Sequence, residues 1–226
     1  MLHETVNLSL SLLVFASCIT SIRAEMRGRR SAAYVFKPLT MLLVLALAVQ
    51  PSVSTSGFYA WMIVGGLLFS LLGDVLLMLP SDRFAAGLAS FLVAHLLYIA
   101  AFAADAGFGS APLVLLPFVL GSAALYPLLR PKLGRLEIPV LLYMLVVSVM
   151  AWQAVARWLA VGQLGALLAC IGAVLFVISD AALALDRFHR PVPVAPLLKR
   201  STYFVGQWLI ALSIGVGEAI VDWSIR

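Results

Sequence analysis

Apolar residues occur in eight long runs, separated by short segments rich in proline, glycine and charged residues. The runs cover residues 5–22, 36–50, 58–79, 84–103, 112–129, 138–156, 162–185 and 202–220. A helix that spans a bilayer needs roughly 17–25 mostly apolar residues, and only the second run is short by this measure. The pattern predicts an all-α membrane protein, with eight transmembrane helices in a single domain that occupies residues 1–226.

Composition supports a membrane protein over a soluble one. The chain is 63% hydrophobic and 11% charged, whereas a soluble domain has about 25% charged residues. Cys18 and Cys170 both lie in apolar runs and indicate neither a disulfide framework nor a metal site. Residues 1–7 lack a basic segment before the first apolar run, so we expect that run to be a retained helix rather than a cleaved signal peptide.

The basic residues are distributed unevenly between the connections. Eight spans would place every Lys and Arg except Arg157 and Arg226 on one side. Positive charge in short connections marks the cytoplasmic side, so we expect that side to be cytoplasmic and both termini to lie outside, in a bacterial inner (plasma) membrane. The basic residues behind the net charge of +5 therefore indicate membrane topology and can also contact lipid phosphates at the surface. They do not indicate nucleic-acid binding.

Two aspartates interrupt the apolar runs. Asp74 is the one acidic or basic residue between positions 58 and 79, and Asp180 occupies a similar run later in the chain. An ionised carboxylate is costly in hydrocarbon and normally faces a protein interior or a wet cavity. Both aspartates are therefore candidate catalytic residues, although a buried aspartate that only pairs with Lys37 or an arginine is the structural alternative.

The surroundings of the two aspartates resemble each other. When Asp74 is aligned with Asp180, small residues coincide nearby, and Asp-Arg-Phe follows each at 82–84 and 186–188. Four helices separate the equivalent positions, which predicts two four-helix halves arranged as parallel repeats. We expect the aspartates of the Asp-Arg-Phe pieces, each balanced by the adjacent arginine, and Asp105 to lie in water.

Polar residues on several runs can face one chamber near the cytoplasmic surface. At about 100° per residue, Ser70 and Asp74 share a face of their helix with small residues. The other runs contribute Lys37, His95, Tyr98, Tyr143, Tyr203 and Gln207. As alternatives to a role in the chamber, His95 could serve only in packing, and Tyr203 and Gln207 could serve only in hydrogen bonds between helices.

Four pieces of sequence carry a resemblance to a known family. They are Lys37-Pro-Leu-Thr40, Phe69-Ser-Leu-Leu-Gly-Asp74-Val-Leu-Leu-Met78, Gly87-Leu-Ala-Ser-Phe-Leu-Val-Ala-His95-Leu-Leu-Tyr98, and Phe176-Val-Ile-Ser-Asp180-Ala-Ala-Leu-Ala184 with Tyr203-Phe-Val-Gly-Gln207. The chain resembles the YhhN-like lysoplasmalogenase family over nearly its whole length. The resemblance implies hydrolysis of the vinyl ether bond of lysoplasmalogens, with no metal or organic cofactor. The substrate would be a lysophospholipid, and the products a fatty aldehyde and glycerophosphocholine or glycerophosphoethanolamine.

Two carboxylates suit this chemistry. A vinyl ether hydrolyses by protonation of its double bond, followed by capture of an oxocarbenium ion by water. Carboxylates in unequal surroundings can divide the roles of acid and stabiliser. We expect Asp74 and Asp180 to form this catalytic pair, with the roles unassigned, and expect substrate binding by Ser70, His95, Tyr98, Tyr203 and Gln207. Lys37 is the expected contact for the head-group phosphate.

A proton-coupled transporter is the competing class, because it also uses buried carboxylates and parallel repeats. Both aspartates lie about five residues from one helix end, which argues against a binding site at the membrane midplane. A non-catalytic lipid-binding or scaffold protein is the third possibility, and it predicts that both Asp→Asn variants keep full activity in cells.

Overall fold

The computed structural model describes residues 2–50, 57–190 and 194–221, and within them it forms a bundle of eight α-helices with no strand. The helices are α1 (Leu2–Met26), α2 (Arg30–Ala48), α3 (Phe58–Met78), α4 (Phe84–Ala103), α5 (Leu115–Leu129), α6 (Glu137–Val161), α7 (Leu164–Phe188) and α8 (Ala195–Val221). Short 3₁₀ turns at Pro112–Val114, Arg130–Lys132 and Gly134–Leu136 flank α5. The predicted all-α architecture and its eight helices are confirmed.

Two helices begin earlier than the apolar runs predicted. Helix α2 starts at Arg30 rather than at 36, and α8 starts at Ala195 rather than at 202. Hydrophobicity marks only the part of a helix that lies in hydrocarbon, whereas backbone hydrogen bonding continues into the polar interface. As a result Lys199 and Arg200 are fixed on a helix instead of lying in a connection.

The outer surface of the bundle is suited to lipid. Helices α1 to α7 are each long and apolar enough to cross a membrane. Large apolar side chains point outward along them, such as Ile138 on α6, which is 78% exposed, and Leu113 in the turn before α5 is 77% exposed. An apolar surface this extensive on a soluble monomer would be an aggregation site. The chain is therefore a membrane protein.

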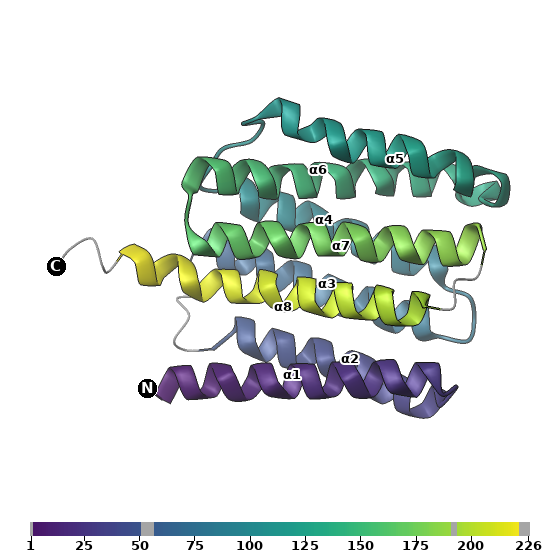
Figure 1. Ribbon diagram of the computed structural model, residues 1–226, viewed down its shortest axis with the longest axis horizontal. Helices are drawn as coiled ribbons and strands as arrows, with labels where there is room; N and C mark the ends of the chain where they lie inside the picture. The colour runs from purple at the N-terminus through teal and green to yellow at the C-terminus, as the bar shows by residue number, and fades with distance from the viewer. Residues whose placement is uncertain (1, 51–56, 191–193, 222–226) are drawn as a thin grey trace.

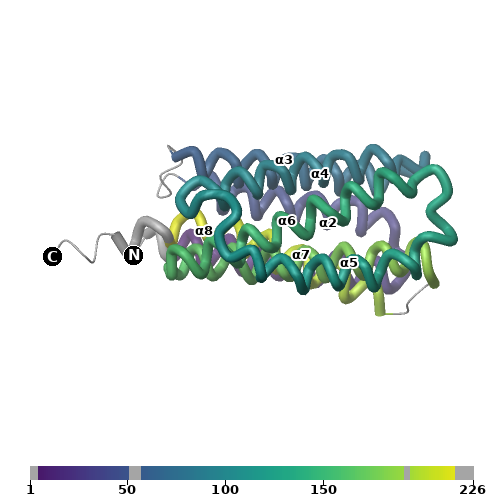
Figure 2. The backbone as a smooth tube through the Cα atoms, turned by 90° about the horizontal axis from the view of Figure 1, so that it is seen from above, coloured from purple at the N-terminus to yellow at the C-terminus, as the bar shows by residue number. Residues whose placement is uncertain are grey.

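The helices run along one common direction, with α1 and α2 at one edge of the bundle and α5 at the other (Figure 1). Seen after a 90° turn, α3 and α4 lie on one side and α5 and α7 on the opposite side (Figure 2). The C-terminal ends of α1, α3, α5 and α7 and the N-terminal ends of α2, α4, α6 and α8 gather at the end that the basic residues predict to be cytoplasmic (Figure 1).

Glycines bring two helix pairs into close contact. A Cβ atom on Gly66 of α3 would clash with the ring of Tyr98 on α4. A Cβ atom on Gly172 of α7 would lie 2.6 Å from the carbonyl oxygen of Gly206 on α8. Close packing of helices through small residues is typical of membrane proteins. The two pairs occupy corresponding places in the two predicted halves, and the repeat itself stays a prediction.

Candidate active site

An open cavity of about 440 Å³ is lined by both membrane-embedded aspartates, Asp74 and Asp180. It lies at the predicted cytoplasmic end of the bundle, and its walls come from α2, α3, α4, α7 and α8 together with the end of α1. Its lining combines polar and charged side chains with apolar ones such as Leu77, Phe91 and Leu183. The cavity therefore joins two carboxylates from distant parts of the sequence.

Asp74 is held by two other helices. Lys37 Nζ on α2 lies 2.9 Å from Oδ1, and the Tyr203 hydroxyl on α8 donates a hydrogen bond of 2.7 Å to Oδ2. The Asp74 side chain is only 3% exposed. The preceding residue, Gly73, lets α4 approach closely, because a Cβ atom there would lie 2.7 Å from the ring of Phe91. Both oxygens of Asp74 are thus engaged in a buried ion pair and hydrogen bond.

Asp180 has a different environment. The Tyr143 hydroxyl on α6 donates a hydrogen bond of 2.6 Å to Oδ2, and His95 Nε2 on α4 lies 3.4 Å from the same oxygen. His95 Nε2 is also 2.9 Å from the Tyr143 hydroxyl, and its ring packs edge-on against Phe176. Among the described residues, Oδ1 of Asp180 has no hydrogen-bond partner. With a side chain that is 16% exposed, Asp180 offers this oxygen to the cavity.

The cavity has a basic rim. Arg30, Lys199 and Arg200 line it. Lys199 is paired with Asp186 (2.7 Å), and Arg200 with Glu25. Arg30 is exposed and has no ion pair with a described residue. Among the three, Arg30 is therefore the cation that no described carboxylate compensates.

Other predicted site residues lie deeper. Ser70, Tyr98 and Gln207 are fully buried and do not line the cavity. The Tyr98 hydroxyl donates a hydrogen bond of 2.7 Å to Gln207 Oε1, which joins α4 to α8. The structure thus places these residues beneath the Asp74–Tyr203 pair, while Lys37 and Tyr203 reach the cavity and His95 reaches it through Asp180.

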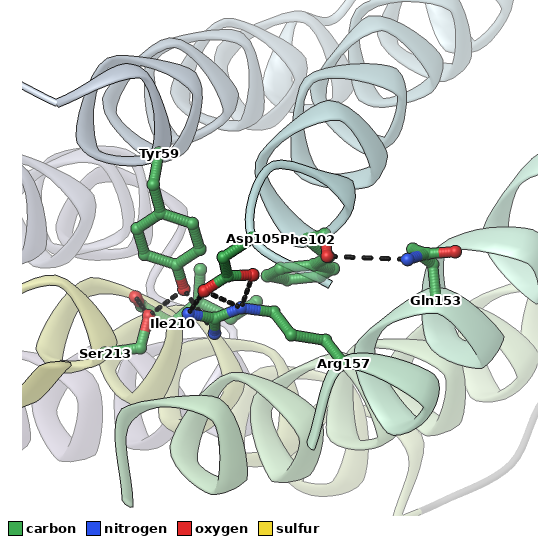
Figure 3. A network of polar contacts seen from close by, with 7 residues as sticks. All are labelled: Tyr59, Phe102, Asp105, Gln153, Arg157, Ile210 and Ser213. Atoms are coloured by element: carbon green, nitrogen blue, oxygen red, sulfur yellow. Dashed lines mark hydrogen bonds and ion pairs between the residues drawn. The ribbon is translucent and has the colours of Figure 1, made fainter. Parts of the chain in front are cut away.

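A second polar network occupies the opposite end of the bundle and includes Arg157 of α6 (Figure 3). The side chain of Arg157 is 5% exposed. Its guanidinium donates to both oxygens of Asp105, the shortest distance being 2.8 Å, and lies over the ring of Tyr59. The Tyr59 hydroxyl is 2.6 Å from Ser213 Oγ on α8. Gln153 donates to the Gly107 carbonyl (2.7 Å). The network ties α3, α6, α8 and the segment after α4 together.

Comparison with known proteins places the chain in a family. The model of the YhhN family matches residues 32–214. The chain belongs to the YhhN family. It is 34% identical to a membrane protein called YhhN from Escherichia coli O157:H7, over 89% of this chain and 96% of that protein. The resemblance seen in the sequence is thereby confirmed.

Other relatives in the comparison carry an activity in their names. The chain is 36% identical to the lysoplasmalogenase TMEM86B of Rattus norvegicus, over 81% of this chain and 72% of that protein. It is 39% identical to the lysoplasmalogenase TMEM86A of Bos taurus, over 71% and 68%. No solved structure matches the chain.

Sequence reasoning on this YhhN-family chain missed several contacts. The polar pattern predicts Tyr143 in the chamber but not as a site residue, and it predicts Lys199 only as part of the topology signal. The spacing of four residues from Lys199 to Tyr203 to Gln207 puts all three on one face of α8, which was an available signal. Arg187 pairs with Asp82 (2.8 Å), which lies between α3 and α4, and Asp186 pairs with Lys199 on α8.

Proposed function

We propose that this chain is a lysoplasmalogenase-like hydrolase. It cleaves the vinyl ether bond of a lysoplasmalogen to a fatty aldehyde and glycerophosphocholine or glycerophosphoethanolamine. Two relatives with this activity in their names support the proposal. The observation that carries it is the unequal pair of carboxylates on one cavity. Asp74 has both oxygens engaged, whereas Asp180 presents Oδ1.

We give the role of acid to Asp180, because its Oδ1 has no hydrogen-bond partner among the described residues. Its proton moves to the carbon of the double bond that is remote from the ether oxygen, and an oxocarbenium ion forms. Water adds to the cationic carbon and returns a proton to the Asp180 carboxylate. The resulting hemiacetal breaks its bond to the glycerol oxygen and gives aldehyde and alcohol, so one water is consumed per bond cleaved. Tyr143 and His95 hold Oδ2 and fix the orientation of Oδ1.

Asp74 supplies a fixed negative charge. In this proposal Asp74 is the ionised partner of the Lys37 ammonium at 2.9 Å, and the Tyr203 hydroxyl fixes its orientation. An ionised group in the same cavity stabilises the positive charge that develops in the transition state. Because Lys37 is engaged by Asp74, the head-group phosphate is better placed at Arg30, with Lys199 and Arg200 beside it on the rim.

The test is aldehyde release from a purified lysoplasmalogen by Asp180→Asn and Asp74→Asn in detergent. Asp82→Asn is the matched control, since Asp82 is an exposed aspartate whose ion pair lies outside the cavity. General acid–base catalysis contributes about 10²–10⁴-fold, and we expect losses of this size in both site variants but not in the control. Losses below tenfold in folded site variants would remove the pair from the chemistry.

A proton-coupled carrier is the alternative proposal. It needs access from both membrane faces, yet the cavity opens at one end and the Arg157–Asp105 network packs the other. Substrate uptake into liposomes without aldehyde release would favour the carrier over the hydrolase.

A further inference from the structure

A narrow apolar slot adjoins the cavity. It has a volume of about 70 Å³ and lies between α4, α5, α6 and α7. Its walls include Leu125, Val140, Met144, Val147, Val177 and Ala184. The Ser122 hydroxyl in its wall is 3.0 Å from Ser148 Oγ. Because this hydroxyl already has a hydrogen-bond partner, it does not make the slot polar.

The slot and the cavity share one wall. Leu77, Phe91, Asp180 and Leu183 line both spaces, and Tyr143 lines the slot while donating its hydrogen bond to Asp180. Asp74 lines only the cavity. The carboxylate with the free oxygen therefore stands where a charged compartment meets an apolar one.

A molecule that occupies both spaces must be polar at one end and a hydrocarbon at the other. In a lysoplasmalogen the vinyl ether lies at the junction of these two parts. We infer that the slot binds the first methylenes of the alkenyl chain, so that the vinyl ether lies beside Asp180. This inference rests on the proposed function and adds the position of the chain to it.

The volume limits how much of the chain the slot can hold. A water-sized group needs about 10–15 Å³ on this scale, so about 70 Å³ accommodates roughly five methylenes. The rest of the chain leaves past α5 into the bilayer. Within α5, only Leu129 is fully buried, which makes this helix the least enclosed wall. Recognition is therefore sensitive to bulk close to the ether and insensitive to total chain length.

The test uses lysophosphocholine with a saturated 1-O-alkyl chain, which binds but has no vinyl ether to hydrolyse. One probe carries a photoreactive diazirine on the fourth chain carbon and a second carries it near the chain end. We expect the first probe to label slot residues such as Met144 and Val147, and the second to label outward residues. Ala184→Leu fills the slot and lowers labelling by the first probe roughly tenfold. The control Ala124→Leu adds the same group at an exposed position of α5 and leaves labelling unchanged.

The outcomes separate the slot from the reaction. Labelling of the outer surface by both probes overturns the slot, even when the wild-type protein releases aldehyde from a lysoplasmalogen. Labelling of the slot by the first probe, without aldehyde release from a lysoplasmalogen by the wild-type protein, upholds the slot as the binding site of the hydrocarbon chain. It overturns the proposed hydrolase activity. If Ala184→Leu does not fold, the two probes on the wild-type protein still decide, because only a chain seated in the slot gives them different labelling patterns.

Discussion

The buried ion pair between Lys37 and Asp74 gives the sharpest prediction. Lys37→Met keeps the length of the side chain and removes its charge, leaving Asp74, 3% exposed, without its counter-ion. At 2.9 Å and an effective dielectric constant of about 20, the attraction is about 6 kcal/mol before desolvation is subtracted. Removing one partner of a buried pair typically costs about 3–5 kcal/mol, or roughly 6–20 °C in Tm for a chain of this size.

The assay measures Tm in detergent and aldehyde release for Lys37→Met, Asp74→Asn and the double variant. We expect the double variant to regain most of the lost stability, because it removes the uncompensated charge. We expect it to stay inactive, because it lacks the ionised carboxylate that stabilises the transition state in the proposed mechanism. A Lys37→Met variant as stable as wild type, or a double variant no more stable than Lys37→Met, would refute the argument that the pair is buried and mutually compensating.

Two further predictions concern the tyrosine at the acid and the network at the far end. Tyr143→Phe removes the 2.6 Å hydrogen bond to Asp180 and leaves His95 as the remaining contact to Oδ2 of the carboxylate. We expect the kcat for aldehyde release to fall about 10-fold, with an unchanged KM for the lysolipid. Asp105→Asn leaves the guanidinium of Arg157, which is 5% exposed, without its carboxylate. We expect the free energy of unfolding to fall by about 3 kcal/mol, with normal activity in the fraction that stays folded. Arg157→Met should cost less stability, because the Asp105 that remains is 44% exposed and can be hydrated.

Local patterns in the sequence predicted the helices well, because burial in a membrane imposes long apolar runs that loops interrupt. They also predicted that Asp74 and Asp180 face a cavity or the protein interior, since a carboxylate in such a run is costly whatever surrounds it, and both line the same cavity. Helix starts at Arg30 and Ala195 were missed because the polar interface hides a helix from hydropathy.

The pairing of side chains between helices could not be read from periodicity. Tyr143 reaches Asp180 from another helix, and Arg187 crosses to Asp82. Asp105, predicted to lie in water, is half exposed but belongs to a buried arginine's ion pair. Such contacts depend on the axial offset and rotation of packed helices, which a one-dimensional pattern of polar positions does not specify.

The network around Arg157 has a consequence for the permeability of the membrane. A protein that keeps charged groups and water within a bilayer risks becoming a pore for protons. Here the guanidinium, its carboxylate and the ring of Tyr59 pack the bundle at the end remote from the cavity. Under the proposed function, a lysolipid can then enter and leave the cavity at one end of the bundle while the packed other end stays closed to ions.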